Sequence, residues 1–316
     1  MKAAIVHGPG QVPAYGDFPS PAAEPGEKRI RVSASALSPL TRARASGTHY
    51  SASGRFPFIA GVDGTGRLDD GKRVYFILPR APYGGLGEET VAPEAHCLPL
   101  PDGLDDVTAA AIANPGMSSW AALTERARFR PGETVLINGA TGASGRLAVA
   151  IARHMGAAKV IATGRDAARL DALGADATIS LADEPETLEA RFAGQFAQGV
   201  DVVLDYLWGM SAERLLIAAA KAGPDGVPIR FIQIGTASGA DITLPGAALR
   251  SSSLELMGSG IGSISLERLL AAVAGVLDAA KAADLRLPVR EVPLTDVEAT
   301  WSASDEARTV FTIEPT

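Results

Sequence analysis

A glycine-rich segment between residues 134 and 164 carries the residue types and spacing that point most directly to chemistry. An apolar run, Thr134 to Ile137, leads into a turn with glycines at positions 139, 142 and 145. A helical pattern follows, and the apolar run from Val160 to Thr163 closes the segment. Strand, tight turn, helix and strand in this order hold a dinucleotide pyrophosphate on backbone N–H groups at a helix N-terminus. A purely structural turn would also explain the glycines. The turn residues predicted to bind a cofactor are Gly142, Ala143, Ser144 and Gly145.

The end of the second strand indicates which cofactor is bound. An NAD site places Asp or Glu here to accept hydrogen bonds from the ribose hydroxyls. This chain has Gly164 instead, followed by Arg165 and, four residues later, Arg169. A glycine leaves room for a 2′-phosphate and arginines can pair with it, so the sequence predicts NADP(H). Two alternatives stay open: the arginines form an exposed helix face, or Asp166 binds a ribose.

Composition and net charge limit the classes of protein to which this chain can belong. The chain has 316 residues, a formal net charge of −7 at pH 7 and one cysteine, Cys97. The acidic balance argues against nucleic acid or an anionic membrane as a partner. A single cysteine allows neither an internal disulfide nor a cysteine-based zinc cluster. The N-terminus does not resemble a signal peptide, and the most apolar helical stretch, 266–283, is interrupted by charges. We therefore expect a cytoplasmic location.

The pattern of residue types along the chain changes near residue 118, which predicts two domains. Residues 1–117 are rich in glycine and proline and contain short β-like runs, typical of a small β domain. Beyond them, continuous apolar runs alternate with helical patterns, which indicates a parallel sheet in an α/β fold. The tail has a mixed pattern and is expected to return to the first domain. A substrate would then bind between the domains, at the carboxyl ends of the strands.

Several segments, added to the glycine turn, give the chain a resemblance to the medium-chain dehydrogenase/reductases, and within them to the zinc-independent quinone oxidoreductases. The segments include PFIAGVDGTG at 57–66, GKRVYF at 71–76, NPGMSSW at 114–120 and DVVLDYLWG at 201–209. The resemblance implies a GroES-like β-barrel catalytic domain, residues 1–117 and 263–316. It also implies a Rossmann NADP(H)-binding domain with a doubly wound parallel sheet, residues 118–262.

The chain departs from the zinc-dependent members of this superfamily. Ser38 stands where those enzymes carry a catalytic cysteine, and Val62-Asp63 stands where they carry His-Glu. Their lobe with four spaced cysteines is absent, so no metal site is predicted. Hydride transfer without a metal requires an acceptor that is already electrophilic, such as a quinone or an α,β-unsaturated carbonyl.

Candidate catalytic residues and further cofactor contacts follow from the resemblance. His49 and Tyr50 follow a Ser-Gly pair and could donate to a carbonyl oxygen or deliver a proton, or they could be loop residues without a role. Asn114 could orient the nicotinamide or the substrate, or it could cap a helix. The remaining predicted cofactor contacts are Tyr206, Leu207, Gly235, Thr236, Ser259 and Gly260. Arg308 is a further candidate, or it is a solvated strand end.

These observations together predict an NADPH-dependent, zinc-independent oxidoreductase that transfers hydride to a quinone or an activated alkene. One alternative is a reductase of enoyl or acryloyl thioesters. Another is a sensor or structural protein that binds NADPH without turnover. The last strand of the second domain, near 253–258, carries few charges and is predicted to lie at a sheet edge. Such an edge invites pairing with a second copy, so we expect a homodimer.

Overall fold

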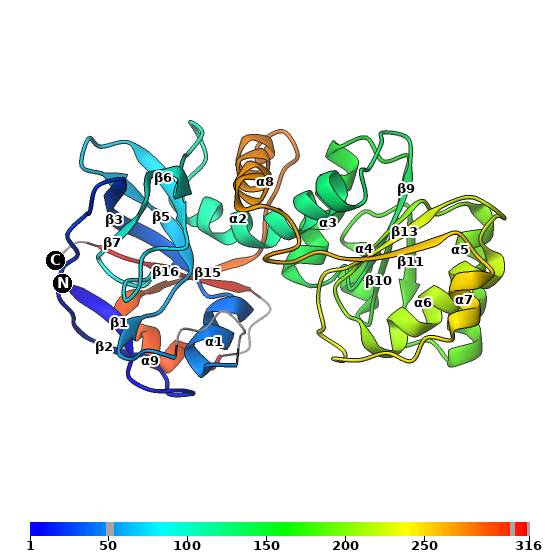
Figure 1. Cartoon of the computed structure of the whole chain (residues 1–316), viewed down its shortest axis with the longest axis horizontal. Helices are drawn as coiled ribbons and strands as arrows, with labels where there is room; N and C mark the ends of the chain where they lie inside the picture. The colour runs from blue at the N-terminus through cyan, green and yellow to red at the C-terminus, as the bar shows by residue number, and fades with distance from the viewer. Residues whose placement is uncertain (49–53, 304–306, 315–316) are drawn as a thin grey trace. The chain divides into compact units, whose positions relative to one another are not determined.

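A computed structural model of the chain (Figure 1) describes residues 1–48, 54–303 and 307–314. By their contacts these residues divide into two units. The first unit comprises Met1–Asn114 and Arg286–Thr316, and the second comprises Pro115–Leu285. His49 and Tyr50, the predicted catalytic residues of the 49–53 segment, lie outside the described residues.

The observed division differs from the predicted one chiefly at residues 263–285, which group with the second unit. These residues include α8 (Leu266–Ala279), whose buried face packs on the end of α2 (Asp106–Ala121). A Cβ built on Gly275 would lie 2.5 Å from the Trp120 ring, and one on Gly116 would lie 2.8 Å from the Val276 side chain. Because helix packing this close needs glycine on one side, the contact holds α8 within the second unit.

The short β-like runs of the first unit form two sheets. The smaller sheet has the strand order β2 (Ala14–Asp17), β1 (Lys2–Val6), β4 (Phe58–Ile59). The larger sheet has seven strands, and its side chains Phe76 and Phe311 are fully buried in the core between the strands and the tail. Its order is β15 (Val289–Pro293), β16 (Arg308–Thr312), β3 (Glu27–Ala36), β5 (Asp63–Leu68), β6 (Arg73–Ile77), β8 (Cys97–Pro99), with β7 (Glu89–Pro93) paired to β3.

The tail returns to the first unit through strand pairing, as predicted. Strand β16 pairs antiparallel with β3 and parallel with β15. Between these last strands lie a 3₁₀ turn (Leu294–Asp296) and the short helix α9 (Val297–Thr300). Helix α1 (Pro39–Ser46) follows β3, and the hydroxyl of Ser38 caps it by accepting the N–H of Thr41 at 3.0 Å.

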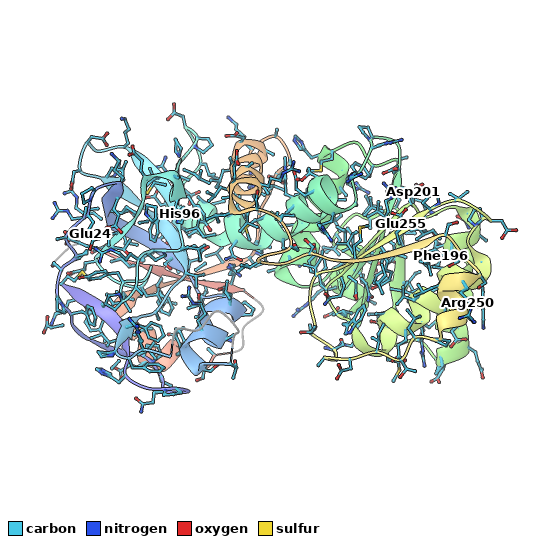
Figure 2. The ribbon with its side chains drawn as sticks, in the orientation of Figure 1. Glu24, His96, Phe196, Asp201, Arg250 and Glu255 are labelled. Atoms are coloured by element: carbon cyan, nitrogen blue, oxygen red, sulfur yellow. The ribbon has the colours of Figure 1, made fainter. Side chains whose placement is uncertain are left out.

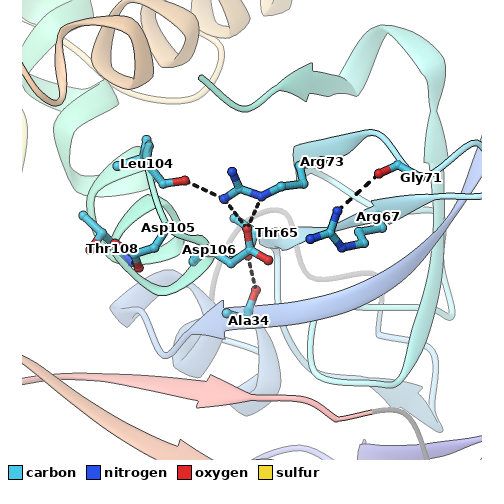
Figure 3. A network of polar contacts seen from close by, with 9 residues as sticks. All are labelled: Ala34, Thr65, Arg67, Gly71, Arg73, Leu104, Asp105, Asp106 and Thr108. Atoms are coloured by element: carbon cyan, nitrogen blue, oxygen red, sulfur yellow. Dashed lines mark hydrogen bonds and ion pairs between the residues drawn. The ribbon is translucent and has the colours of Figure 1, made fainter. Parts of the chain in front are cut away.

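A polar network in the first unit anchors the beginning of α2 (Figure 3). Arg73 on β6 donates from Nε to the Asp106 carboxylate at 3.0 Å, and its Nη2 reaches the carbonyl of Leu104. The hydroxyl of Thr65 donates to the carbonyl of Asp106 at 3.1 Å. The contacts join two strands to the first turn of the helix, so they set where α2 leaves the sheet.

The second unit is built on a six-stranded parallel sheet. In chain order its strands take the arrangement 3-2-1-4-5-6, which is the doubly wound dinucleotide-binding order. The sheet order is β11 (Ala177–Ser180), β10 (Lys159–Gly164), β9 (Thr134–Asn138), β12 (Val202–Asp205), β13 (Ile229–Gln233), β14 (Leu254–Gly258). This arrangement confirms the predicted α/β class.

Helices connect these strands and cover the sheet with apolar faces. They are α3 (Ala143–His154), α4 (Ala167–Asp171), α5 (Pro185–Gln198), α6 (Gly209–Ala222) and α7 (Gly246–Arg250). Phe196 on α5 is fully buried in the core, whereas Glu255 on β14 is exposed (Figure 2). Strand β14 pairs only with β13 among the described strands, so it occupies the predicted edge position. Over the described residues no helix is both long and apolar enough to cross a bilayer.

Candidate functional site

The glycine turn of the second unit has the geometry of a phosphate cradle. Gly139 follows β9 with a φ of 89°, a left-handed conformation that favours glycine. A Cβ on Gly145 would lie 2.3 Å from Gly139 O, so glycine lets α3 begin this close to the turn. Gly142 precedes α3 without a side-chain cap, and a Cβ there would come no closer than 3.7 Å to a neighbour. The first N–H groups of α3 are thus left for an anion, which fits a dinucleotide pyrophosphate.

A buried polar network holds the strand ends beneath this turn. Asn138 donates from Nδ2 to Asp205 Oδ1 at 2.8 Å and to the Ser211 hydroxyl at 2.9 Å. The Thr163 hydroxyl donates to Asn138 Oδ1 at 2.7 Å and accepts the N–H of Gly139 at 3.2 Å. Asn138 ends β9, Thr163 lies near the end of β10 and Asp205 ends β12, so the network spans the point where strand order reverses. That point is where ligands bind in open α/β sheets.

Asp205 does more in this network than bind Asn138. Its carboxylate also accepts the backbone N–H groups of Leu207 at 3.1 Å and Trp208 at 3.2 Å. Burial raises the pKa of Asp205, and the hydrogen bonds from Asn138 and the two N–H groups oppose this rise. Trp208 has a φ of 58°, so the carboxylate holds the loop after β12 in a conformation that a bulky residue rarely adopts. The network therefore shapes two of the loops at the predicted cofactor edge.

The two arginines predicted to bind a 2′-phosphate both follow the end of β10, and they have different surroundings. A Cβ on Gly164 would lie 2.7 Å from the Thr141 side chain, so glycine allows β10 to meet the turn. Arg165 follows it and is exposed. Arg169 instead lies with Nε 3.2 Å from Asp166 Oδ2, while Asp166 Oδ1 accepts the Arg169 N–H as the cap of α4. Of the pair, Arg165 is the one that is exposed and has no ion-pair partner among the described residues.

The other predicted cofactor contacts all follow the carboxyl ends of parallel strands. Loops after β9, β10, β12, β13 and β14 carry them, and parallel pairing brings these ends to one edge of the sheet. Leu207 packs over the glycine turn, because a Cβ on Gly139 would lie 2.8 Å from its side chain. The residues that this edge brings together are Gly142, Ala143, Ser144, Gly145, Gly164, Arg165, Arg169, Tyr206, Leu207, Gly235, Thr236, Ser259 and Gly260.

Tyr206 turns its hydroxyl into the protein. The hydroxyl lies 2.7 Å from Ser119 Oγ, which in turn donates to the carbonyl of Ser144 at 3.2 Å. Burial raises the pKa of Tyr206 above its usual value. A Cβ on Gly235 would lie 2.5 Å from Tyr206 O, so these two loops touch through their backbones. Tyr206 therefore ties α2 to the first turn of α3, and its hydroxyl is engaged inside the protein.

Asn114 lies inside a helix, which corrects the expectation that Asn-Pro opens one. Helix α2 runs from Asp106 to Ala121 with Pro115 in its interior. The Ser118 hydroxyl donates to the carbonyl of Pro115 at 2.7 Å, so this serine does not cap the helix start either. A run of small apolar residues before Asn114 is helical throughout, and the helix continues past the proline despite its missing N–H.

The side chain of Asn114 belongs to a buried polar cluster in the first unit. Tyr75 donates to Asp63 Oδ2 at 2.6 Å, and both side chains are fully buried. Burial raises the pKa of Asp63 to about 6, while contacts with Tyr75, Arg308 and Asn114 lower it. Burial likewise lowers the pKa of Arg308. Over the described residues, Asp63 Oδ1, Asn114 Nδ2, and Nε and Nη2 of Arg308 are buried and have no hydrogen-bond partner. Arg308 is thus half-buried, with Nε and Nη2 shielded from solvent, and is not a solvated strand end.

The side chains at positions 38, 62 and 63, compared above with zinc ligands, make other contacts in this chain. Ser38 caps α1, and its hydroxyl lies 2.9 Å from that of Thr41. Val62 is buried, and Asp63 accepts the Tyr75 hydroxyl. Over residues 1–48, 54–303 and 307–314, no three His, Cys, Asp or Glu side chains are grouped to hold a metal ion.

Sequence reasoning missed two sets of functional candidates. The network of Asn138, Thr163 and Asp205 had a visible signal, because each is a polar residue at the end of an apolar strand. The contact between Asp63 and Arg308, of which only Arg308 was predicted as a candidate, had a weaker signal, because the two residues lie far apart in the chain and meet only through β5 and β16. Pairing of β16 to β3, and of β3 to β5, brings them together.

Comparison with known proteins agrees with this geometry. No protein-family model matches the chain. A probable NADPH-dependent quinone reductase of Emericella nidulans is 29% identical, over 96% of each chain. A polyketide synthase subunit of Mycobacterium tuberculosis is 32% identical over 243 residues, which span 71% of this chain and 10% of the synthase.

Solved structures extend the agreement to the whole chain. The quinone oxidoreductase of Thermus thermophilus, also solved in complex with NADPH, matches with a TM-score of 0.81. The two are 30% identical, and the match covers 99% of this chain and 100% of that one. The two chains thus share one fold along their full length. The chain belongs to the quinone oxidoreductase branch of the medium-chain dehydrogenase/reductase superfamily, with a GroES-like unit and a Rossmann unit.

Proposed function

We propose that the protein is an NADPH-dependent oxidoreductase that reduces quinones or α,β-unsaturated carbonyls. The full-length likeness to the Thermus quinone oxidoreductase carries this proposal. When bound, NADPH supplies a hydride to an electrophilic carbon of the acceptor. A proton then completes the product, which is a hydroquinone or a saturated carbonyl compound, with NADP⁺ released. What the chain contributes is binding, orientation and hydrogen-bond donors.

The carboxyl edge of the Rossmann sheet is the proposed cofactor site. The uncapped N–H groups at the start of α3 bind the pyrophosphate, and the Asn138 network holds the surrounding loops. Gly164 and Arg165 favour the 2′-phosphate, since Asp166 is engaged with Arg169 and cannot readily accept from a ribose. Arg165 therefore contributes more than Arg169 to the preference for binding NADPH over NADH.

A direct binding titration tests the cofactor assignment. Arg165→Ala should weaken NADPH binding roughly tenfold or more and leave NADH binding within about twofold, because only NADPH carries the 2′-phosphate. Arg153→Ala is the matched control, since Arg153 is an exposed arginine at the far end of α3. Equal losses for NADPH and NADH would contradict the 2′-phosphate assignment.

An acceptor assay tests the reaction. NADPH oxidation, followed at 340 nm, should require 1,4-benzoquinone or an enone such as but-3-en-2-one, and should be absent with a saturated ketone. Binding of NADPH without turnover on any acceptor would favour the sensor or structural alternative.

Proton donors and hydrogen-bond donors are proposed from both the sequence and the first unit. His49 and Tyr50 are retained as candidates to donate to the acceptor oxygen. Asn114 Nδ2 lies beside the Asp63 carboxyl and is a buried donor with no hydrogen-bond partner among the described residues, which supports a role in holding a carbonyl group. Tyr50→Phe and Asn114→Ala should each lower kcat more than they raise the KM for NADPH. The reaction is proposed to need no zinc, because Ser38 and Val62 replace zinc ligands, and dialysis against a chelator should leave the rate unchanged.

A homodimer is proposed through β14. This edge strand has a free side, and Leu256 on it is exposed. Pairing of two copies would convert both edges into one continuous sheet. Sedimentation should give a dimer for the natural chain and a monomer for Leu256→Lys. A monomer for both would contradict the interface.

Reduction of enoyl thioesters is a second candidate, favoured by the match to a polyketide synthase subunit. Comparison of crotonyl-CoA with 1,4-benzoquinone as the oxidant of NADPH separates the two functions.

A further inference from the structure

A cavity of about 290 Å³ lies within the first unit, next to α1 and the turn before β4. Its walls include Phe56, Phe58 and Tyr83, together with the backbone of neighbouring proline-rich loops. The Phe56 and Phe58 rings lie 5.4 Å apart with their planes tilted by 42°. Aromatic walls of this kind favour a flat, conjugated ligand, because ring faces and edges pack well against planar groups.

Arg44 places one positive charge on this cavity. It lies in the last turn of α1 and is half-buried, and burial lowers the pKa of its guanidinium. No described carboxylate pairs with Arg44, and none of the described lining residues is Asp or Glu. The carbonyl end of an eight-residue helix offers it only a weak attraction. Arg55 also lines the cavity but has another interaction, so the argument depends on Arg44.

Arg42 on the same helix provides a comparison for Arg44. It is exposed, it does not line the cavity, and its Nη2 donates to the carbonyl of Ala303 at 2.9 Å. A guanidinium that is partly removed from water without a counter-charge is costly, and an anion with two parallel oxygens relieves that cost best. Two arginines that lie two positions apart, and so on different faces of one helix, thus differ: Arg42 has a hydrogen-bond partner, and Arg44 lacks an anion among the described residues.

We propose that this cavity binds acceptors that carry a carboxylate, with Arg44 pairing to the carboxylate and the aromatic side chains packing on the conjugated body. The proposal rests on the proposed reductase function and names its substrate class: flat quinones or enones with one acid group. A cavity of about 290 Å³ holds such a molecule but not the nucleotide arm of a CoA thioester.

Two pairs of probe molecules, each an acid and its methyl ester, test the effect of the carboxylate charge while the conjugated body stays the same. The first pair is trans-cinnamate and its methyl ester, whose binding is measured by calorimetry without NADPH. The second pair is trans-3-benzoylacrylate and its methyl ester, whose reduction by NADPH is measured at steady state. In the natural chain we expect each acid to be preferred over its ester.

Variants then assign that preference to one side chain. Arg44→Gln should weaken cinnamate binding, and lower kcat/KM for benzoylacrylate, roughly tenfold to a hundredfold, while both esters change less than about twofold. Arg44→Lys should recover part of the loss, because it keeps the charge but not the paired donors. Arg42→Gln, the matched control on the same helix, should leave all four probes unchanged.

Three results would overturn the proposal. Equal losses for acid and ester in Arg44→Gln would make Arg44 a packing residue, and equal losses in Arg42→Gln would indicate a general charge effect. A raised KM for NADPH with no acid preference would assign Arg44 to a cofactor phosphate. If Arg44→Gln does not fold, the partial loss in Arg44→Lys decides the question. Cinnamate binding that depends on Arg44, with no acceptor reduced, would instead sink the reductase function and leave this site standing.

Discussion

The two units each bury a polar cluster around an aspartate, but the clusters are built differently. In the Rossmann unit, Asp205 accepts hydrogen bonds from Asn138 and from two backbone N–H groups. In the first unit, the Asp63 carboxylate accepts a hydrogen bond from Tyr75, and its other oxygen is buried with no partner among the described residues. Within the same described residues, the buried Nε and Nη2 atoms of Arg308 also have no hydrogen-bond partner. In the Asp205 cluster the polar groups pair with one another, and we call this cluster closed. In the Asp63 cluster some buried donors and acceptors have no partner among the described residues.

The contrast between the two clusters indicates different roles for them. Closed networks rigidify what they hold, and the Asp205 network holds the turn and loops of the proposed cofactor edge. Buried groups without partners are costly, and such groups concentrate where a protein meets ligands or changes protonation state. We therefore expect the Asp205 cluster to contribute stability and the Asp63 cluster to respond to pH.

The largest effect should come from opening the closed network. Asp205→Ala leaves Asn138 Nδ2 and the N–H groups of Leu207 and Trp208 without an acceptor, so it should lower the free energy of unfolding by about 3 to 5 kcal/mol. Urea denaturation at pH 7 measures the loss. Asp201→Ala is the control: Asp201 (Figure 2) accepts one backbone N–H, from Thr134 at 2.8 Å, and should cost about 1 kcal/mol. Similar losses for both aspartates would remove the contrast between the clusters.

A pH-dependent effect should be confined to the other cluster. The folded pKa of Asp63 is raised to about 6, so the protonated form favours folding and its stabilisation is lost as pH rises. Relative to Asp63→Asn, the natural chain should lose about 2 kcal/mol of stability between pH 4 and pH 7. The measurement is urea denaturation of both proteins across this range. Asp69→Asn, at an exposed aspartate, should run parallel to the natural chain. A constant difference between Asp63→Asn and the natural chain would show that Asp63 does not titrate.

The smallest expected effect is a pH-dependent difference in stability between two variants that each lose one hydroxyl group. Tyr75→Phe removes the donor to Asp63, and it should cost about 2 kcal/mol at pH 8 but about 1 kcal/mol at pH 5, because a bond to a carboxylate is the stronger one. Thr163→Val removes a bond to the neutral amide of Asn138, so its cost of about 1 to 2 kcal/mol should not change between these pH values. Thermal unfolding at the two pH values checks both. A pH-independent cost for Tyr75→Phe would contradict the placement of charge on Asp63.

Much of the Rossmann unit could be predicted because its signals are local. The glycine turn, the apolar strands and the edge position of residues 253–258 depend on neighbours in the chain, and each is present as expected. The unit boundary near α8 was less accessible, because helix packing between Gly275 and Trp120 joins distant segments. The role of Asn114 was obscured by Pro115, since a proline normally suggests a helix end, and here the helix continues through it.

The class of fold, the position of the dinucleotide turn and the replacement of zinc ligands at positions 38 and 62 could all be derived from residue types alone. They follow from which residues stand next to one another, and neighbours along the chain remain neighbours in any fold. Three other features required the folded chain: Asp166 engages Arg169, Asp63 meets Tyr75 and Arg308, and Arg44 faces a cavity while Arg42 does not. Those outcomes depend on strand register and helix rotation, and both are set by burial across the whole unit.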